Sequence, residues 1–275
     1  GLDRNRMARL SVWIAIALGI IQGVVEWLPI SSEGVVSVVL TALDVSSDAS
    51  VQLALFLHAG TGFAAIAYYR DDIVELFREV RGWNRNTDPF SPEAETATFV
   101  IVATAVSVVV AGGAYLTLLE AATELAGGAF IAAIGVLLVL TGVLQWVAER
   151  SEGGDRDLGL VDPVLVGAGQ GLAVLPGVSR SGTTASILLL RGHSGERSFR
   201  LSFLISIPAA FGAGLLTVEE VALDPLIAGI ALLTSAVVGY ATIGALMRVV
   251  RRLPFWQVCF GLGGLAILGG GLLLV

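Results

Sequence analysis

Two polar motifs of the same layout interrupt apolar sequence, and their side chains are the ones that could do chemistry. The first, QGVVEWLPISSEG, runs from Gln22 to Gly34, and the second, QGLAVLPGVSRSG, runs from Gln170 to Gly182. The two copies are offset by 148 residues in a chain of 275. Because polar groups are costly in hydrocarbon, a carboxylate, an arginine and several hydroxyls placed in such runs are expected to be in use.

The second motif has the chemistry of a phosphate cradle. Arg180 offers a planar fork of donors suited to phosphate oxygens. The half-helix expected from about residue 183 would add free backbone N–H groups and a positive helix end. Its glycines permit a tight turn and a close approach of the backbone to a ligand. We expect ligand contacts from Gly177, Ser179, Ser181, Gly182, Thr183 and Thr184. The alternative is that Arg180 only pairs with a carboxylate and so orients the chain.

The first motif supplies carboxylates and hydroxyls. Glu26 lies four residues after Gln22, on one face of a helix. It could bind a divalent cation, act as a general base or pair with Arg180. Ser31 and Ser32 follow a proline. Either could be a nucleophile if a base lies within hydrogen-bond reach, or could simply cap a helix.

Four further residues could bear on function, and for most of them a structural role is the simpler interpretation. Glu33 is a second carboxylate for a metal or, more simply, an exposed charge at a helix start. His58 lies in an apolar span, where a lone histidine is more often a packing residue, and His193 lies in a polar turn and is expected to be solvated. Cys259 is the only cysteine, so the chain has no internal disulfide and no thiolate metal site.

Composition identifies a membrane protein. Hydrophobic residues make up 55% of the chain and charged residues 14%, with a mean hydropathy of +0.85. A soluble domain would carry about 25% charged residues. The net charge is −7 and every basic residue is arginine. An acidic chain of this kind is not expected to bind nucleic acid, because phosphate backbones are recognised by excess positive charge.

Apolar segments predict about six spans and two hairpins. We place them at 11–29, 34–43, 51–69, 96–118, 125–148, 159–176, 183–191, 200–217, 225–247 and 255–275. The segments 34–43 and 183–191 are too short to cross a bilayer. Each motif is therefore expected at the tip of a re-entrant helical hairpin, which is tolerated only where it is buried in protein or lines a wet cavity.

These segments predict an all-α polytopic membrane protein with an inverted repeat. Each half is a re-entrant hairpin followed by three transmembrane helices, and the halves lie at about 10–150 and 158–275 of a single membrane domain, 1–275. A hairpin returns to its own side of the membrane, whereas three spans carry the chain to the other side. The second half therefore starts on the opposite face, and the two hairpins can meet near the middle of the membrane. Trp27, Trp83, Trp146 and Trp256 mostly lie near span ends, where interfacial anchoring explains them.

Loop charges predict the orientation. One face would carry Arg70, Arg78, Arg81, Arg85, Arg150, Arg156, Arg191, Arg197, Arg200, Arg248, Arg251 and Arg252, including a solvated connector at 70–95. The other face would carry Arg4, Arg6 and Arg9 with acidic loops near Asp44, Glu120 and Glu219. The arginine-rich face should be cytoplasmic. We therefore expect a plasma-membrane protein whose termini and active site face outside; the N-terminal arginines argue mildly against this.

Together the motifs resemble those of the undecaprenyl-diphosphate phosphatases of the bacitracin-resistance type. The likeness rests on QGVVE at 22–26, LPISSEG at 28–34, PGVSRSGTT at 176–184 and RLSFLISIP at 200–208, and it covers nearly the whole chain. The third run is highly specific to the family and the first is moderately specific. The resemblance implies an integral membrane enzyme with two inverted repeats and re-entrant hairpins, often dimeric, so a homodimer is one expectation.

The resemblance also implies an activity and site roles. Members remove the terminal phosphate of a C55-type isoprenoid diphosphate with Mg²⁺ or Ca²⁺. By likeness, Glu26 with Gln22 fits the acidic motif and Ser32 fits the serine proposed as nucleophile. The diphosphate-binding residues would be Ser179, Arg180, Ser181 and Thr184. The family usually has histidine directly after Gly34, where this chain has Val35; Glu33 or His58 could compensate.

Two functions from different classes follow. The first is a phosphatase in which Arg180 and backbone N–H groups neutralise the phosphates, a cation on Glu26 assists, and Ser32 or water attacks the terminal phosphorus. The second is a polyprenyl-phosphate transporter on the same scaffold without hydrolysis, which Val35 would favour, since broken helices that meet at the membrane midplane are typical of transporters. A channel or a purely structural protein would leave both motifs unused.

Overall fold

The computed structural model describes residues 12–84, 87–125, 127–151, 154, 156–221, 223–250 and 253–274. Within these ranges the chain is helical and contains no β-strand, so the all-α prediction is confirmed. The elements are α2 (Val12–Val25), α3 (Ser32–Ala42), α4 (Ser47–Tyr68), α5 (Arg70–Gly82), α6 (Glu95–Ala114), the π-helix η1 (Tyr115–Leu119), α7 (Glu120–Glu124), α8 (Gly128–Ala148), α9 (Val161–Leu172), α10 (Arg180–Leu190), α11 (Gly195–Thr217), α12 (Pro225–Val250) and α13 (Phe255–Leu272).

Six helical stretches of the described chain are long and apolar enough to cross a membrane. They are Ser47–Tyr68, Glu95–Glu124, Gly128–Ala148, Gly195–Thr217, Pro225–Val250 and Phe255–Leu272. The predicted number of spans is confirmed, and the chain is a multi-pass membrane protein. The second span is α6 extended without a break through η1 and α7.

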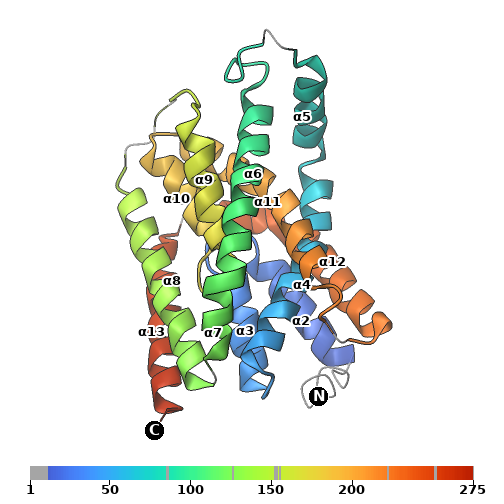
Figure 1. Ribbon diagram of the computed structural model, residues 1–275, viewed down its shortest axis with the longest axis vertical. Helices are drawn as coiled ribbons and strands as arrows, with labels where there is room; N and C mark the ends of the chain where they lie inside the picture. Colours follow the sequence, from blue (N-terminus) through green and yellow to red (C-terminus); the bar gives the residue numbers. More distant parts are fainter. Residues whose placement is uncertain are drawn as a thin grey trace.

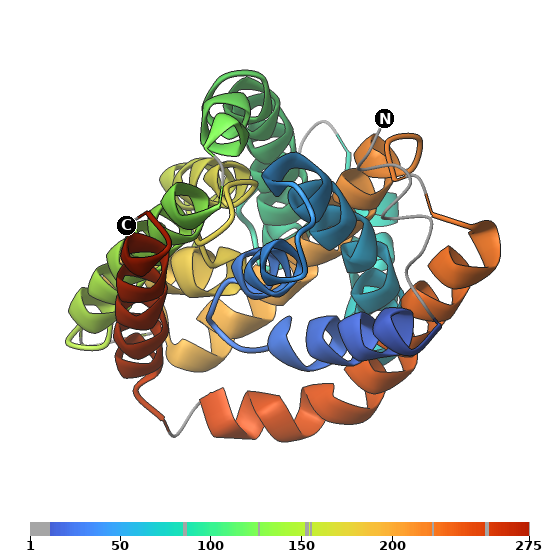
Figure 2. The ribbon, with the colours of Figure 1, turned by 90° about the horizontal axis from the view of Figure 1, so that it is seen from below.

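The remaining apolar helices form two hairpins, α2 with α3 and α9 with α10. Each of these helices has 11 to 14 residues, which is too short to cross a bilayer of the usual thickness. In Figure 1 the first hairpin begins and ends toward the lower end of the molecule and the second toward the upper end, and their turns meet between. Seen from below, α3 lies near the centre, with α12 and α13 at the edge (Figure 2). The relation of the two halves by an inverted repeat stays a prediction.

Glycine allows the helices to approach closely. α8 packs along α13, where a Cβ placed on Gly135 would lie 2.6 Å from the carbonyl oxygen of Gly263. α2 packs along α12, where a Cβ on Gly23 would lie 2.8 Å from the backbone nitrogen of Gly239. Small residues of this kind drive helix association in lipid, because hydrocarbon offers no hydrophobic gain between helices. α2 of the first hairpin is thereby packed closely against the full span α12.

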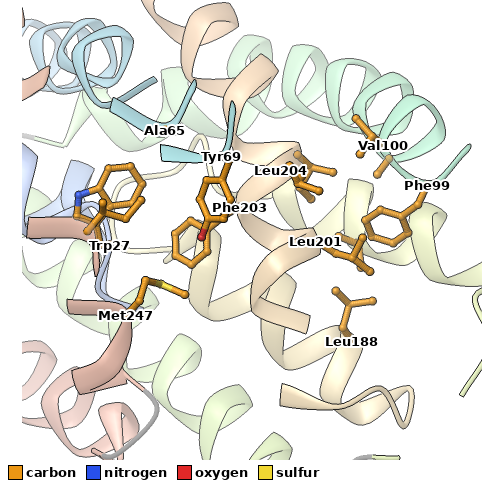
Figure 3. Close-up of a cluster of buried hydrophobic side chains, with 14 of the residues drawn as sticks. Trp27, Ala65, Tyr69, Phe99, Val100, Leu188, Leu201, Phe203, Leu204 and Met247 are labelled. Carbon is orange, nitrogen blue, oxygen red and sulfur yellow. The ribbon is translucent and has the colours of Figure 1, made fainter. Parts of the chain in front are cut away.

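The largest buried cluster lies beside the hairpin turns (Figure 3). Phe203 of α11 packs between Trp27 and Tyr69, with ring centroids 5.8 and 6.1 Å away. Trp27 is 1% exposed, and its indole N–H donates to the carbonyl of Gly239 at 3.0 Å. The prediction of an interfacial role for Trp27 is therefore wrong. This tryptophan fixes the turn of the first hairpin against α11 and α12.

Arginine ion pairs gather at the end of the bundle where α5 lies. Arg200 pairs with Asp72 of α5 at 2.5 Å, and Arg197 pairs with Glu95 of α6 at 2.6 Å. The connector predicted at 70–95 thus contains a helix that is tied to α11. Arg4, Arg6, Arg9, Arg85, Arg251 and Arg252, on which part of the charge argument rests, lie outside the described residues.

A buried polar cluster joins the two ends of the second hairpin. Asp162, at the start of α9, accepts from Arg191 Nε at 2.7 Å and lies 3.4 Å from Nε2 of His193. Burial alone would raise the pKa of Asp162, but the hydrogen bonds from Arg191 and the Gly159 N–H, with the ring of His193 close by, outweigh it and hold that pKa below its ordinary value. His193 is fully buried, so the prediction of a solvated histidine is wrong. The cluster closes the base of the hairpin.

Candidate active site at the hairpin tips

Both hairpin turns are built in the same way. The first helix of each pair ends before a proline, at Pro29 in one copy and Pro176 in the other, because proline cannot continue a helix. A serine then caps the second helix. Ser31 accepts from the Gly34 N–H and Ser179 from the Gly182 N–H, each at 3.1 Å. The motif serines nine residues after each glutamine are therefore helix caps.

Hydrogen bonds join the two tips to each other. The Gly177 N–H donates to Ser31 Oγ at 2.9 Å, and Ser181 Oγ donates to the Leu28 carbonyl at 3.3 Å. Gly177 has φ +105°, and a Cβ there would lie 2.5 Å from the Ile134 carbonyl, so only glycine fits. Two turns from distant parts of the sequence thus form one rigid unit.

Glu26 is the centre of the site. One carboxylate oxygen pairs with Arg180 Nη2 of the second tip. The other accepts from Gln22 Nε2 at 2.9 Å and Ser32 Oγ at 2.7 Å, and lies 3.1 Å from His58 Nε2. The side chain of Glu26 is 3% exposed. A buried carboxylate needs partners of this kind, since an unpaired charge at this depth would be strongly destabilising.

His58 of α4 lies in the site, where the sequence offered it only as one of two residues that could compensate for Val35. Its Nδ1 bonds the Ala54 carbonyl at 2.8 Å, so that nitrogen carries a proton. Its Nε2 lies 3.0 Å from Glu33 Oε1 and 3.3 Å from Ser32 Oγ. The imidazole thus contacts both carboxylates of the first motif and not only apolar side chains. Because His58 lies 26 residues after Ser32 in the chain, no local pattern links the two. The one indirect signal was the valine after Gly34, where the family usually has histidine.

The alternatives for Glu33 and the serines are resolved by geometry. Glu33 is 5% exposed, so the interpretation as an exposed charge is wrong. Its carboxylate contacts Nε2 of His58, the same nitrogen that Glu26 contacts. Ser31 binds backbone N–H groups of both tips. Ser32 faces the carboxylate of Glu26 and the imidazole instead. Of the two, Ser32 alone is placed for chemistry.

Most of the residues predicted to form the phosphate cradle already have contacts within the protein. Thr184 Oγ1 bonds Ser202 of α11 at 2.6 Å, and Ser179 Oγ accepts from the Gly182 N–H. Gly182 leaves room for Gln145, which donates to the Pro29 carbonyl. Thr183 is buried near the tip. Arg180 differs, because its Nη1 is buried without a hydrogen-bond partner within the described chain. That nitrogen is available to an anion.

A cavity of about 260 Å³ leads away from the tips. Arg180, Glu33 and His58 form part of its wall, and residues of α6 and α11 form much of the rest. The α6 and α11 walls are mostly small and apolar, including Val108, Ala111, Ala210, Ala213 and Leu216. An apolar passage that ends at an arginine suits a ligand with a hydrocarbon chain and an anionic head.

The carboxylates, as arranged, do not fit a resident divalent cation. Both oxygens of Glu26 are engaged, and Glu33 bonds His58 and Ser31. Hard cations need oxygen ligands that are turned toward one point. Within the described ranges no group of three or more His, Cys, Asp or Glu side chains is set to hold a metal.

Comparison with known proteins gives consistent matches. The family described as Bacitracin resistance protein BacA matches residues 15–265. A protein of Haloarcula marismortui named undecaprenyl-diphosphatase is 51% identical over 264 residues, covering 94% of this chain and 97% of its own. Proteins of the same name from Methanococcoides burtonii and Alkaliphilus metalliredigens are 38% and 34% identical; they cover 94% and 88% of this chain, and 98% and 92% of their own.

Alanine at Ser31 and alanine at Ser32 should lower the stability of the protein to different degrees. Ser31→Ala should lower the free energy of unfolding by about 2 kcal/mol, because it removes a cap and leaves the Gly177 N–H without its acceptor. Ser32→Ala should cost less stability, because the carboxylate of Glu26 keeps its bonds to Gln22 and Arg180 when this hydroxyl is removed. Unfolding of both variants in detergent measures this. Equal losses would contradict the assignment of the two serines.

Proposed function

We propose, because the chain belongs to the family of bacitracin resistance protein BacA, that it hydrolyses an undecaprenyl-type polyprenyl diphosphate to the monophosphate lipid and inorganic phosphate. One observation carries the mechanism: the Ser32 hydroxyl lies between the carboxylate of Glu26 and the imidazole of His58, in a site that Arg180 completes at an apolar cavity. A nucleophile held by a base and oriented by a third group is the arrangement that phosphoryl transfer through a covalent intermediate requires.

Ser32 acts as the nucleophile in this proposal. Its Oγ attacks the terminal phosphorus, a new P–O bond forms, and the bond from that phosphorus to the bridging oxygen breaks. The hydroxyl proton passes to the carboxylate of Glu26, which lies 2.7 Å away and already accepts a hydrogen bond from this hydroxyl. The imidazole of His58, 3.3 Å from the hydroxyl, orients it. The lipid monophosphate leaves, and water then cleaves the phosphoserine to release phosphate. Direct attack by a water molecule in the same place is the variant that the geometry also allows.

Arg180 supplies the main electrostatic stabilisation. One of its nitrogens is fixed by Glu26, which orients the guanidinium, and the other has no protein partner within the described chain. It lies in the first turn of α10, whose positive end favours an anion. Stabilising charge that develops during transfer is usually the largest catalytic contribution. The resemblance implies Mg²⁺ or Ca²⁺, but because the donor set does not fit a resident ion, no step here runs through a metal.

The hydrocarbon chain of the substrate would occupy the cavity between α6 and α11. The side chains that these helices contribute are mostly alanine, glycine, valine and leucine. A lipid that enters sideways from the bilayer keeps its chain in apolar surroundings while its head group reaches Arg180. Burial of apolar surface would contribute roughly 0.8 kcal/mol for each CH₂ group that leaves water, but less for a chain that leaves lipid.

We place the protein in the plasma membrane with its site toward the outer face. The described arginines of α5 lie at the end opposite the acidic segment of α7, and arginine-rich ends stay in the cytoplasm. The Glu120→Cys variant should react with a membrane-impermeant thiol reagent added to intact cells, and the Arg78→Cys variant should not. Native Cys259 is fully buried, so background labelling should be low. The reverse pattern would overturn the orientation.

A transporter that performs no hydrolysis is not favoured. The curated relatives are named as diphosphatases, and His58 supplies the imidazole whose absence beside Gly34 had pointed to transport. A transporter would exchange labelled lipid phosphate between leaflets without release of inorganic phosphate. Phosphate release from isoprenoid diphosphate therefore separates the two functions.

Three substitutions test the proposed mechanism. Ser32→Ala, His58→Ala and Arg180→Ala should each lower phosphate release from farnesyl or undecaprenyl diphosphate by about 10²-fold to 10⁴-fold, the range for loss of a group that takes part in proton transfer or stabilises charge. Ser37→Ala is the matched control, because Ser37 is also buried on α3 but its hydroxyl has no partner in the described chain. Assays run with and without a chelator.

Full activity in purified Ser32→Ala or Arg180→Ala would contradict the mechanism. Loss of wild-type activity in chelator would show that the carboxylates of Glu26 and Glu33 rearrange to accept a cation during turnover. Loss of activity in Ser37→Ala equal to that in Ser32→Ala would mean that packing of α3, not the hydroxyl of Ser32, is what the assay reports.

A further inference from the structure

Gln170 opens the second motif but does not serve the reacting carboxylate. In the first motif Gln22 donates to Glu26, four residues later. In the second motif the residue four positions after Gln170 is Val174, so Gln170 has no carboxylate to support on its own helix. It is nevertheless buried, with 4% of its surface exposed. A buried amide that has lost its intrahelical partner needs another explanation.

Glycines on either side of Gln170 press α9 against α6. A Cβ placed on Gly167 would lie 2.5 Å from the Ala103 carbonyl, and one on Gly171 would lie 2.6 Å from Val110 Cβ. This close approach brings Gln170 to Ser107 of α6, and Nε2 donates to the serine hydroxyl at 3.2 Å. The backbone contacts therefore fix where the amide lies.

Gln170 belongs to the wall of the same cavity as Arg180 and His58. Gln170, Ser107 and Thr104 all line the cavity of about 260 Å³ that also contains Arg180 and His58 in its wall. Gln170 Oε1, Thr104 Oγ1 and Arg180 Nη1 are buried without partners within the described chain. Three unsatisfied polar atoms around one largely apolar cavity indicate a polar ligand group that completes them.

The chemistry of these atoms suits phosphate oxygens. An amide can present either its oxygen or its NH₂ group to the cavity, because the hydroxyl of Ser107 can donate to one or accept from the other. With the NH₂ group turned inward, Gln170 donates two N–H bonds. Thr104 Oγ1 and Arg180 Nη1 are donors as well. Gln170 and Thr104 therefore add hydrogen-bond donors to the cavity wall, beyond Arg180, which serves the terminal phosphate in the proposed mechanism.

We propose that Gln170, fixed by Ser107 and joined by Thr104, binds the inner phosphate of the lipid diphosphate, the one that stays on the isoprenoid; this rests on the proposed function. With the terminal phosphorus at Ser32, the inner phosphate must lie on the side where the hydrocarbon chain continues into the cavity. Gln170 and Thr104 line that cavity. They are positioning residues that hold both the substrate and the monophosphate product, and they take no part in bond cleavage.

Binding and kinetics together test this subsite in the full chain. Purified protein in detergent is titrated with a methylene-bridged farnesyl diphosphonate, which cannot be hydrolysed. Gln170→Leu and Thr104→Val should each weaken binding about tenfold, the loss of one hydrogen bond to a charged group. KM for farnesyl diphosphate should rise by the same factor, with kcat within about twofold of wild type. Inhibition by farnesyl monophosphate should weaken equally, because its phosphate is the inner one.

Thr98→Val is the matched control for Thr104→Val. Thr98 lies on the same helix, is 4% exposed and has an unpartnered hydroxyl, but it does not line the cavity. It should bind the diphosphonate as wild type does. If Gln170→Leu fails to fold, Thr104→Val still decides the matter, because valine has nearly the shape of threonine.

The proposal falls if Gln170→Leu and Thr104→Val bind the diphosphonate as tightly as wild type, or if kcat drops while KM stays constant. It also falls if monophosphate inhibition is unaffected, because the donors would then serve the terminal phosphate. These failures leave the proposed function intact when the wild type releases phosphate. A wild type that releases none refutes the function instead, and the diphosphonate titration still tests the subsite by itself.

Discussion

The ion pair between Glu26 and Arg180 is the contact on which the site depends. Each group comes from a different hairpin, and each is nine-tenths or more buried. Removing two charges from water is costly, so the pair persists only because further partners complete it: Gln22, Ser32 and His58 on the carboxylate, and the turn contacts around Gly177. The pair therefore needs both tips in place and, once formed, holds them together in the membrane.

The two motifs contribute different groups to the site. The first tip contributes the carboxylates and the serine hydroxyl, and the second contributes the guanidinium and the start of α10. The spans position them: α4 presents His58, and α6 and α11 wall the cavity. Hydroxyls that look alike in sequence have separate tasks, since Ser31 and Ser179 complete the turns while Ser32 faces the reacting groups.

The sequence predicted the spans and the short helices of the two hairpins, because hydropathy is a local property of the chain. The cost of buried charge marked Glu26 and Arg180 as residues in use but left their pairing as one of several roles. The sequence left open, or misplaced, the residues whose surroundings depend on distant helices. His58 lies on an apolar span and becomes a site residue only when α4 packs beside the first tip, and Glu33 is buried because that imidazole pairs with it. Trp27 and His193 were misplaced for the same reason: span ends and polar turns can be covered by other helices.

A double-mutant cycle on unfolding in detergent tests the central claim most directly, using Glu26→Gln, Arg180→Gln and the combination. Each single change leaves one buried charge without its partner, at a cost of about 3–5 kcal/mol, whereas the double change leaves neither. The account predicts that the double variant is more stable than the sum of the single losses by on the order of 3 kcal/mol. Losses that simply add would show that the two hairpin tips are not coupled through this pair.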